Sequence, residues 1–361
     1  MSPVSTQNEH AIPAADASAS IFAGASSPVD VPGAPPIPGL RFRLLAGSID
    51  YPAMMEVINA AYGADGVEEV VTLEQLAAEY DHPAGFVPLR DVLVAEADGR
   101  MIAFSRTNNV ERSGGGRTYG HRGFVHPGFR RRGLGRAMLR RNEAHLRTLA
   151  AADPPGAKAF DSWTLEGEAG AGALLRSEGY LPVRHFFDMV RPDLEGIPVT
   201  PLPPGLEIRP VRAEDVRRVF EADNEAFRDH WGHREETEED MAAFMAIPDT
   251  DTSLWVVAWD GDEVAGLALS TIYAADNEAF GRQRGWVDSL AVRRPWRRRG
   301  LGRALLGESL RSLRGRGMTS AALGVDTENL SGALGLYESV GFVVDKRSMV
   351  LRKALEGAGA S

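Results

Sequence analysis

The chain contains no cysteine. Disulfide bonds, thiolate zinc sites and a cysteine nucleophile are therefore excluded, and a reducing environment is compatible with the sequence. No apolar run approaches the roughly 18 residues that a membrane-spanning helix needs. The first lysine or arginine is Arg41, so the basic region of a secretory signal is also missing. We expect a cytoplasmic protein that has no membrane partner.

Acidic residues outnumber basic ones, by 50 to 40. The formal net charge is −10 at pH 7 over 361 residues, and lysine occurs only at positions 158, 346 and 353. This balance disfavours a nucleic-acid partner, because phosphate backbones bind to basic surfaces. It suits a small cationic partner such as an amine. A hydrophobic content of 43% and a charged content of 25% are typical of a globular protein, and the length allows two domains.

One motif occurs twice. It reads Phe-Arg-Arg-Arg-Gly-Leu-Gly-Arg-Ala-Met-Leu from Phe129 and Trp-Arg-Arg-Arg-Gly-Leu-Gly-Arg-Ala-Leu-Leu from Trp296. Each copy follows a strand-like run and precedes a helix-like run, and the backbone N–H groups at the start of a helix favour a phosphate. The copies lie 167 residues apart, from Gly133 to Gly300. This spacing indicates two related domains, because solenoid repeats have periods of about 20–50 residues.

Composition and repeated segments predict the domain boundaries. Residues 1–38 are rich in Ala, Pro, Ser and Gly, which predicts a disordered tail. The segment Pro38–Arg43 is echoed by Pro204–Arg209, and each resembles a first strand. Prolines gather between the two halves and indicate a stiff linker. The expected units are domains over 39–191 and 205–354, a linker over 192–204 and a flexible tail over 355–361.

Each half reads as β-α-β-β-β-α-β-α-β-β, which predicts an α+β fold with a mixed sheet. Asp98-Gly99 and Asp260-Gly261 are strong signals for the turns of β-hairpins. In the second half, Leu306, Leu310 and Leu313 share one face of the helix that follows the repeated motif.

Two other phosphate-binding motifs do not fit the glycine-rich turn. A P-loop needs Gly-Lys-Ser/Thr, but Arg303-Ala304 follows the glycines. A dinucleotide fingerprint needs Gly or Ala three residues after Gly302, where Leu305 stands. A purely structural alternative remains, in which Gly300 and Gly302 only permit a tight turn and the arginines are solvated. The duplicated surroundings disfavour that alternative.

Further segments of the second half extend the pattern. They are Val287–Val292, running into Arg297–Gly302, then Gly324–Asn329, Leu336–Glu338 and Val340–Phe342. Together they resemble the acyl-CoA motif of the GNAT superfamily of N-acetyltransferases.

The resemblance covers about residues 205–353 well and about residues 39–191 less well. It implies two tandem GNAT domains with α/β/α layers, each a mixed, mostly antiparallel, twisted sheet flanked by helices. The tandem arrangement is similar to that of the mycothiol synthases, although the sequence does not establish their substrate for this chain.

The resemblance also implies acetyl-CoA as the donor. Its pyrophosphate is expected on the amides of the second turn, where the helix dipole and unpaired N–H groups favour an anion. Its pantetheine arm is expected along the preceding strand, where an amide would polarise the thioester carbonyl. The expected cofactor-binding residues are Leu290, Ala291, Val292, Arg297, Arg298, Arg299, Gly300, Leu301, Gly302, Arg303 and Asn329.

Two residues are candidates for the chemistry of transfer. Tyr337 matches the family's acid, which protonates the leaving thiolate; its alternative is a core aromatic on a helix. Asp288 is the candidate base for the acceptor ammonium; its alternative is a strand residue that faces solvent. The acidic stretch Glu235–Asp240 is a rival source of the base, but it is typical of the negative first turn of a helix.

A short loop motif, His230-Trp231-Gly232-His233, lies in the second half. Two histidines at this spacing can bind a metal, but a third ligand is not evident, so no metal is expected. Trp231 is expected to form an apolar or cation–π wall over the acceptor site, with plain packing as the alternative.

The first half departs from the family pattern. Aligning Gly179 with Gly341 puts Leu175 opposite Tyr337 and Gly167 opposite Asn329. The acid and the asparagine are therefore missing, whereas Arg130–Gly135 keeps the whole turn. We expect this half to have lost transfer chemistry; the sequence leaves open whether it binds coenzyme A.

The sequence thus predicts an N-acetyltransferase that acetylates the primary amine of a small molecule by direct attack in a ternary complex. Two alternatives remain: an acyl-CoA sensor or scaffold without transfer, and an acetyltransferase acting on a protein or peptide N-terminus. The chain is expected to be a monomer or a homodimer.

Overall fold

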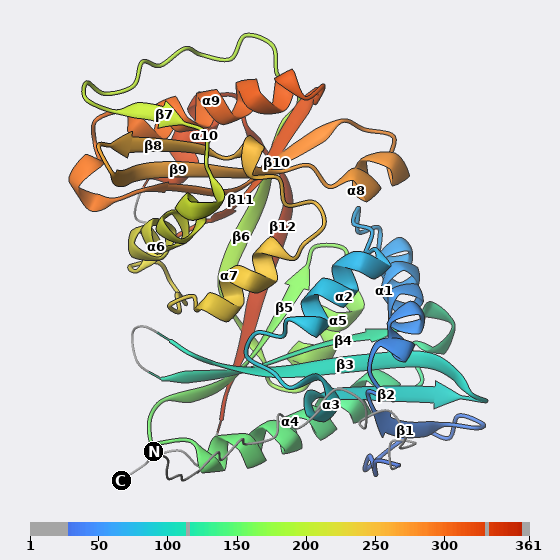
Figure 1. Cartoon of the computed structure of the whole chain (residues 1–361). Coiled ribbons are helices and arrows are strands. Elements are labelled where there is room, and N and C mark those ends of the chain that lie inside the picture. The colour runs from blue at the N-terminus through green and yellow to red at the C-terminus, as the bar shows by residue number, and fades with distance from the viewer. Residues whose placement is uncertain (1–27, 113–115, 329–331, 356–361) are drawn as a thin grey trace, which may run out of the picture.

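The computed structural model describes residues 28–112, 116–328 and 332–355, and its strands form one twelve-stranded sheet (Figure 1). The first half of the chain provides β1 (Arg41–Leu44), β2 (Val92–Ala97), β3 (Arg100–Glu111), β4 (Arg117–Val125), β5 (Lys158–Leu165) and β6 (Leu181–Arg191). The second half provides β7 (Glu207–Arg209), β8 (Val256–Asp260), β9 (Glu263–Thr271), β10 (Arg284–Val292), β11 (Ser320–Asp326) and β12 (Val343–Ala354).

Helices cover both faces of the sheet. The first half provides α1 (Tyr51–Asp65), α2 (Leu73–Asp81), α3 (Pro88–Asp91), α4 (Leu134–Ala152) and α5 (Ala169–Ser177). The second half provides α6 (Val216–Phe227), α7 (Glu238–Met245), α8 (Ala274–Ala279), α9 (Leu301–Gly315) and α10 (Ala333–Ser339). Within the described ranges, no helix combines the length and the apolar character that crossing a membrane requires.

The alternation of buried side chains along the strands shows on which face of the sheet each helix lies. Val92 and Val94 share a core with α1 and α2, whereas Leu93 and Ala95 share a core with α4. Successive residues of a strand point to opposite faces, so these two helix layers lie on opposite sides of the sheet. In the second half, α9 and α10 pack on one face and α6 on the other. The predicted fold class, a mixed sheet flanked by helices, is confirmed.

The two halves exchange their last strands. The strand order is β1-β2-β3-β4-β5-β12-β6-β11-β10-β9-β8-β7. Strand β6 of the first half pairs with β11, strand β12 of the second half pairs with β5, and β6 and β12 pair with each other. Figure 1 shows both strands running between the two bodies. Each half therefore completes the sheet of the other.

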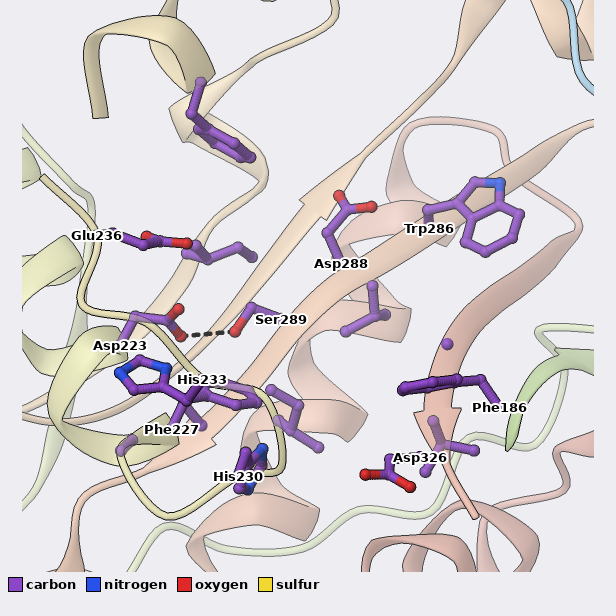
Figure 2. A pocket seen from close by; sticks show the side chains of 18 of the residues that line it. Phe186, Asp223, Phe227, His230, His233, Glu236, Trp286, Asp288, Ser289 and Asp326 are labelled. Carbon is purple, nitrogen blue, oxygen red and sulfur yellow. Dashed lines mark hydrogen bonds between the residues drawn. The ribbon is translucent and has the colours of Figure 1, made fainter. Parts of the chain in front are cut away.

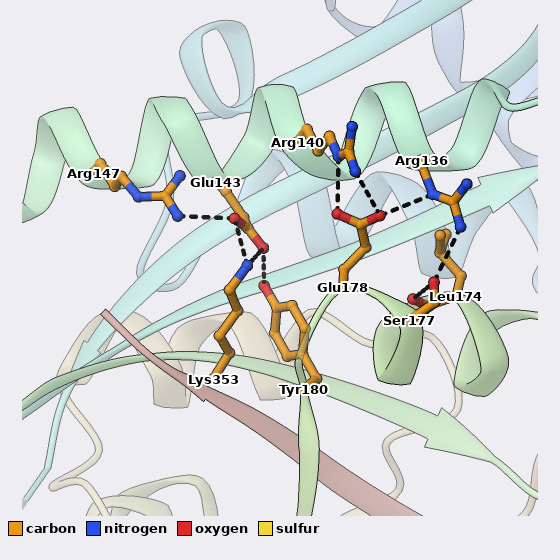
Figure 3. Close-up of polar contacts among 9 residues, drawn as sticks. All are labelled: Arg136, Arg140, Glu143, Arg147, Leu174, Ser177, Glu178, Tyr180 and Lys353. Atoms are coloured by element: carbon orange, nitrogen blue, oxygen red, sulfur yellow. Dashed lines mark hydrogen bonds and ion pairs between the residues drawn. The ribbon is translucent and has the colours of Figure 1, made fainter. Parts of the chain in front are cut away.

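A buried ion pair fastens β12 to the first half. The Lys353 ammonium donates to both carboxylate oxygens of Glu143 on α4, at 2.8 and 3.0 Å (Figure 3). The Tyr180 hydroxyl and the Arg147 guanidinium donate to the same carboxylate, each at 3.0 Å. Glu143 is only 4% exposed. Several donors to one carboxylate offset the free-energy cost of burying its charge.

The prediction of a disordered tail over residues 1–38 is wrong for its last part. Residues 28–38 pack against the first half: Pro28 forms a bridge to β1, and Val31 and Ile37 are buried beside α4. The proline- and alanine-rich composition hid these apolar side chains, which bury enough surface to order the segment. Residues 1–27 lie outside the described residues, as do residues 356–361 of the tail expected over 355–361.

Replacing Lys353 with methionine is expected to lower the free energy of unfolding by about 1–3 kcal/mol, because a buried carboxylate loses one of its two charged donors but keeps Arg147 and the neutral Tyr180 hydroxyl. Urea denaturation followed by circular dichroism measures this change. Lys346→Met, on the same strand, is the control: its ammonium lies 3.1 Å from an exposed Glu68, so the loss should stay within about 1 kcal/mol. Equal losses in the two variants would contradict the anchoring role of Glu143.

Candidate functional site

The site begins where two parallel strands separate. β10 and β11 pair only from Arg284 with Ser320 to Val287 with Leu323. Beyond that point β10 stays paired with β9, and β11 stays paired with β6. The facing edges of β10 and β11 then carry backbone groups without a strand partner between them, which an extended ligand can satisfy. A register shift next to Asp288 marks a bulge at the point of separation.

The second copy of the repeated motif forms the turn at the end of β10. Arg298 and Gly300 have φ angles of 60° and 84°, and α9 begins at Leu301. The first amide bonded inside this helix is that of Ala304, which donates to the Gly300 carbonyl at 3.1 Å. The amides of Leu301–Arg303 have no acceptor within the helix and lie at its positive end. This turn can bind an anion.

Arg297 holds the turn in place. Its guanidinium donates to the Val292 carbonyl at 2.8 Å and to the Ala226 carbonyl, at the end of α6, at 2.9 Å. Its amide donates to the Arg294 carbonyl at 3.3 Å. The N–H groups that remain available to bind an anion therefore lie after Arg297 in the turn.

A cavity of about 1690 Å³ connects this turn with the space between the two halves. Small-molecule sites typically measure about 300–1,000 Å³, so the cavity has room for two ligands together. The predicted residues that line it are Asp288, Leu290, Ala291, Val292, Arg297, Arg298, Gly300, Leu301, Gly302, Arg303 and Tyr337. Arg299 belongs to the same turn but is not a lining residue, and Asn329 lies outside the described residues.

The wall opposite the turn is built partly by the first half. Glu69, Trp163, Phe186 and Asp188 all line the cavity. Figure 2 shows Phe186 across the cavity from Asp223 and Ser289 of the second half. The space between the halves therefore depends on both.

Tyr337 lies on α10 and is 7% exposed. Its ring packs 6.1 Å from that of Phe342, and the residue also lines the cavity. Burial raises the pKa of its phenol to about 12. The hydroxyl is therefore protonated at neutral pH and can donate a proton but not accept one.

Asp288 is the bulged residue of β10, and its carboxylate opens into the cavity. It accepts a hydrogen bond from the Tyr273 hydroxyl at 3.3 Å. Enclosure by the surrounding protein raises the pKa of this carboxyl group, although hydrogen bonds from Thr271 and Tyr273 oppose the shift. A carboxylate with a raised pKa accepts a proton more readily than an ordinary one.

A second carboxylate, which the sequence reading missed, belongs to Asp223 and contacts Ser289, the residue after Asp288. The Ser289 hydroxyl donates to Asp223 of α6 at 2.6 Å (Figure 2). Burial raises the pKa of Asp223 to about 7; the bond from Ser289 opposes this shift, and the charge of Glu236 adds to it. One signal was available in the sequence. Asp223 falls at helical spacing on the same face of α6 as Val219 and Ala226, which are buried. Carboxylates are rarely buried, so one on this face is an informative exception.

Trp231 forms a wall of the cavity and packs against exchanged strands. Its ring lies 5.4 Å from the Arg184 guanidinium of β6 and 5.3 Å from that of Arg352 on β12. Burial lowers the pKa values of both His230 and His233. Across the described residues, no group of three His, Asp or Glu side chains is arranged to hold a metal.

The first copy of the turn has the same backbone but different surroundings. Arg131 and Gly133 have φ angles of 63° and 92°, and α4 begins at Leu134. Pro35 lies 3.8 Å from the point where a Cβ of Gly133 would be, whereas Gly300 has no atom within 4 Å of that point. The segment 28–38 therefore lies close to the first turn, while the second turn is open.

The separation of β4 and β5 in the first half is bridged by side chains. The two strands pair over Arg117–Gly120 and then diverge, as β10 and β11 do. Arg122 of β4 donates to the Trp163 carbonyl of β5 at 2.7 Å and pairs with Glu168 at 2.6 Å. Leu175, 4% exposed, stands where Tyr337 stands in the second half. The first half therefore has no phenol at that position, and the Arg122 side chain bridges the gap between β4 and β5.

Comparison with known proteins identifies relatives of both halves. The acetyltransferase (GNAT) family model matches residues 216–342, and an acetyltransferase (GNAT) domain model matches residues 88–180. The mycothiol acetyltransferase of Geodermatophilus obscurus is 31% identical over 80% of this chain and 90% of its own length. That of Thermobispora bispora is 31% identical over 81% of this chain and 92% of its own length.

Solved structures share the fold over most of the chain. A GCN5-related N-acetyltransferase from Sphaerobacter thermophilus aligns with a TM-score of 0.65 and 27% identity, covering 88% of this chain and 96% of that one. A tandem GNAT protein from the clavulanic acid biosynthesis pathway aligns with a TM-score of 0.64 over 89% of this chain and 99% of that one, at 17% identity.

Proposed function

The chain belongs to the GNAT family of acetyl-CoA-dependent N-acetyltransferases, and on that premise we propose that its second half acetylates the primary amine of a small molecule. The observation that carries this proposal is the continuous cavity from the open turn of α9 to the space between the halves. The lining of the cavity includes the carboxylates of Glu69, Asp188, Asp276 and Asp288. Such a lining attracts a cationic amine.

The turn and the separated strand edge suit acetyl-CoA. We propose that its pyrophosphate binds the amides of Leu301–Arg303, with charge-assisted bonds from the side chains of Arg298 and Arg303. The extended pantetheine arm would satisfy the free backbone edge of Leu290–Val292, and an amide there would polarise the thioester carbonyl. The first half, with its bridged gap, would act as a wall of the acceptor site.

Transfer would proceed by direct attack in a ternary complex. The amine nitrogen forms a bond to the thioester carbon, and the carbon–sulfur bond breaks. Asp288 takes one proton from the acceptor ammonium, and Tyr337 gives its proton to the departing sulfur; of the two protons that the nitrogen loses, one restores the phenol and the other goes to solvent. The pKa shifts of the two residues suit these roles: the raised pKa of Asp288 favours proton uptake, and Tyr337 is a neutral phenol.

An acceptor screen tests this function. Spermidine, D-glucosamine, kanamycin and a short peptide with a free N-terminus would each be mixed with acetyl-CoA and the full chain, and released thiol would be followed with a thiol reagent. The chain has no cysteine, so it adds no background. We expect thiol release with at least one small amine, faster than with the peptide. Binding of acetyl-CoA without thiol release would indicate a sensor, and preference for the peptide would contradict the proposed acceptor class.

Replacing Tyr337 with phenylalanine is expected to lower kcat about 10²-fold, because the thiolate would leave without an acid. The ring remains, so packing against Phe342 and the Kd of acetyl-CoA should change little. Steady-state kinetics and isothermal titration calorimetry measure the two effects. A turnover equal to that of the wild type would rule out the acid role.

Replacing Gly300 with alanine is expected to weaken acetyl-CoA binding about tenfold, because a left-handed φ of 84° costs a residue with a Cβ about 1–2 kcal/mol. Gly133→Ala is the matched control: it imposes similar strain at φ 92° in the turn of the first half. Calorimetry should show an unchanged Kd for that control. Equal weakening by both substitutions would contradict the assignment of the cofactor to the second half.

A further inference from the structure

We propose that Asp223, reached through the hydroxyl of Ser289, is a second proton acceptor for the transfer reaction. The proposal rests on the function proposed above. It assigns a catalytic role to a pair of residues that the resemblance to the family did not single out.

The proton balance of the reaction leaves a role for a second acceptor. A primary ammonium carries three protons on nitrogen, and the amide product carries one. Two protons therefore leave the nitrogen as the carbon–nitrogen bond forms and the carbon–sulfur bond breaks. Tyr337 gives one proton to the sulfur and is left as a phenolate. One of the two protons from the nitrogen later restores this phenol and the other passes to solvent, so the complete reaction releases one proton. Asp288 can hold the first proton from the ammonium, and we infer that a second base takes the other proton before it reaches the phenolate or solvent.

The geometry places Asp223 and Ser289 where that base is needed. Ser289 directly follows Asp288 on β10, and the bulge allows both neighbours to line the cavity. Ser289 lies on the side of the cofactor edge Leu290–Val292, whereas Asp288 contacts Tyr273 on the acceptor side. The Ser289 proton points to Asp223 at 2.6 Å, which leaves the lone pairs of the hydroxyl oxygen free to accept an N–H.

The surroundings keep Asp223 suited to this task. Glu236 precedes α7, His230 and His233 follow α6, and Asp288 lies on β10; all four line the same cavity. Burial and the negative charge of Glu236 bring the pKa of Asp223 to about 7. At and above neutral pH the carboxylate form accepts a proton and can return it to solvent without a large free-energy cost.

A merely structural role would be to fasten α6 to β10, and Asp223→Asn separates the two roles. The amide oxygen of asparagine still accepts the bond from Ser289, so packing is retained, whereas proton acceptance is lost. Ser289→Ala removes the hydroxyl from the path. Ser289→Thr keeps the hydroxyl and tolerates the strand backbone, so it is the conservative control.

The experiment measures kcat against pH for the full chain and these variants at saturating acetyl-CoA, with spermidine, D-glucosamine and kanamycin as acceptor probes. In the wild type, kcat should fall as pH falls through about 7, because Asp223 becomes protonated. Asp223→Asn should lower kcat about 10- to 100-fold and remove this limb, with an unchanged KM for acetyl-CoA. Ser289→Ala should lower kcat and shift the fall in kcat to higher pH, because the hydrogen bond from Ser289 lowers the pKa of Asp223. Ser289→Thr should restore both the wild-type kcat and the wild-type pH profile.

A second readout does not depend on the acceptor. In protein labelled with ¹³C at the aspartate carboxyl groups, the resonance that disappears in Asp223→Asn should titrate with a midpoint near 7. A midpoint near the ordinary value of about 4, or an Asp223→Asn variant with wild-type kcat and pH profile, would overturn the proposal. Failure of the wild type to acetylate any probe would instead overturn the proposed function, and the role of Asp223 with it.

Discussion

The separation of β10 from β11 is the feature on which the rest of the site depends. Each strand leaves the other because it keeps a different partner: β9 for β10, and the exchanged strand β6 for β11. Arg184 of β6 reinforces this arrangement by pairing with Asp326 at the end of β11, at 2.8 Å. The same guanidinium lies over the Trp231 ring. The first half therefore contributes to the site even though its own turn is not open, because its last strand holds one side of the gap.

Two turns with the same backbone have different environments. Both use a left-handed arginine, a left-handed glycine and a helix that begins at leucine. In the first half, Arg122 and Glu168 bridge the strands and Pro35 lies close to the turn. In the second half, the positions beside the turn line a cavity. The two turns thus differ in side chains and segments outside the motif, and a motif match alone cannot establish binding.

Local signals in the sequence predicted much of the fold. Asp98 and Gly99 have φ angles of 49° and 79° between β2 and β3, as a tight hairpin turn requires. Leu306, Leu310 and Leu313 are fully buried on one face of α9. The exchange of β6 and β12 could not be predicted in this way, because pairing is a long-range choice between two strands of similar character. Asp223 was missed for a related reason: its contact with Ser289 forms only once α6 is packed on β10.

The central claim is that acetyl-CoA occupies the gap and turn of the second half only. Hydrogen exchange of the backbone amides, followed by mass spectrometry with and without acetyl-CoA, tests it most directly. We predict slower exchange on binding at Ser289–Val292 and at Leu301–Arg303, with no change at Leu134–Arg136. Slowing at both turns, or at the first turn alone, would contradict this account.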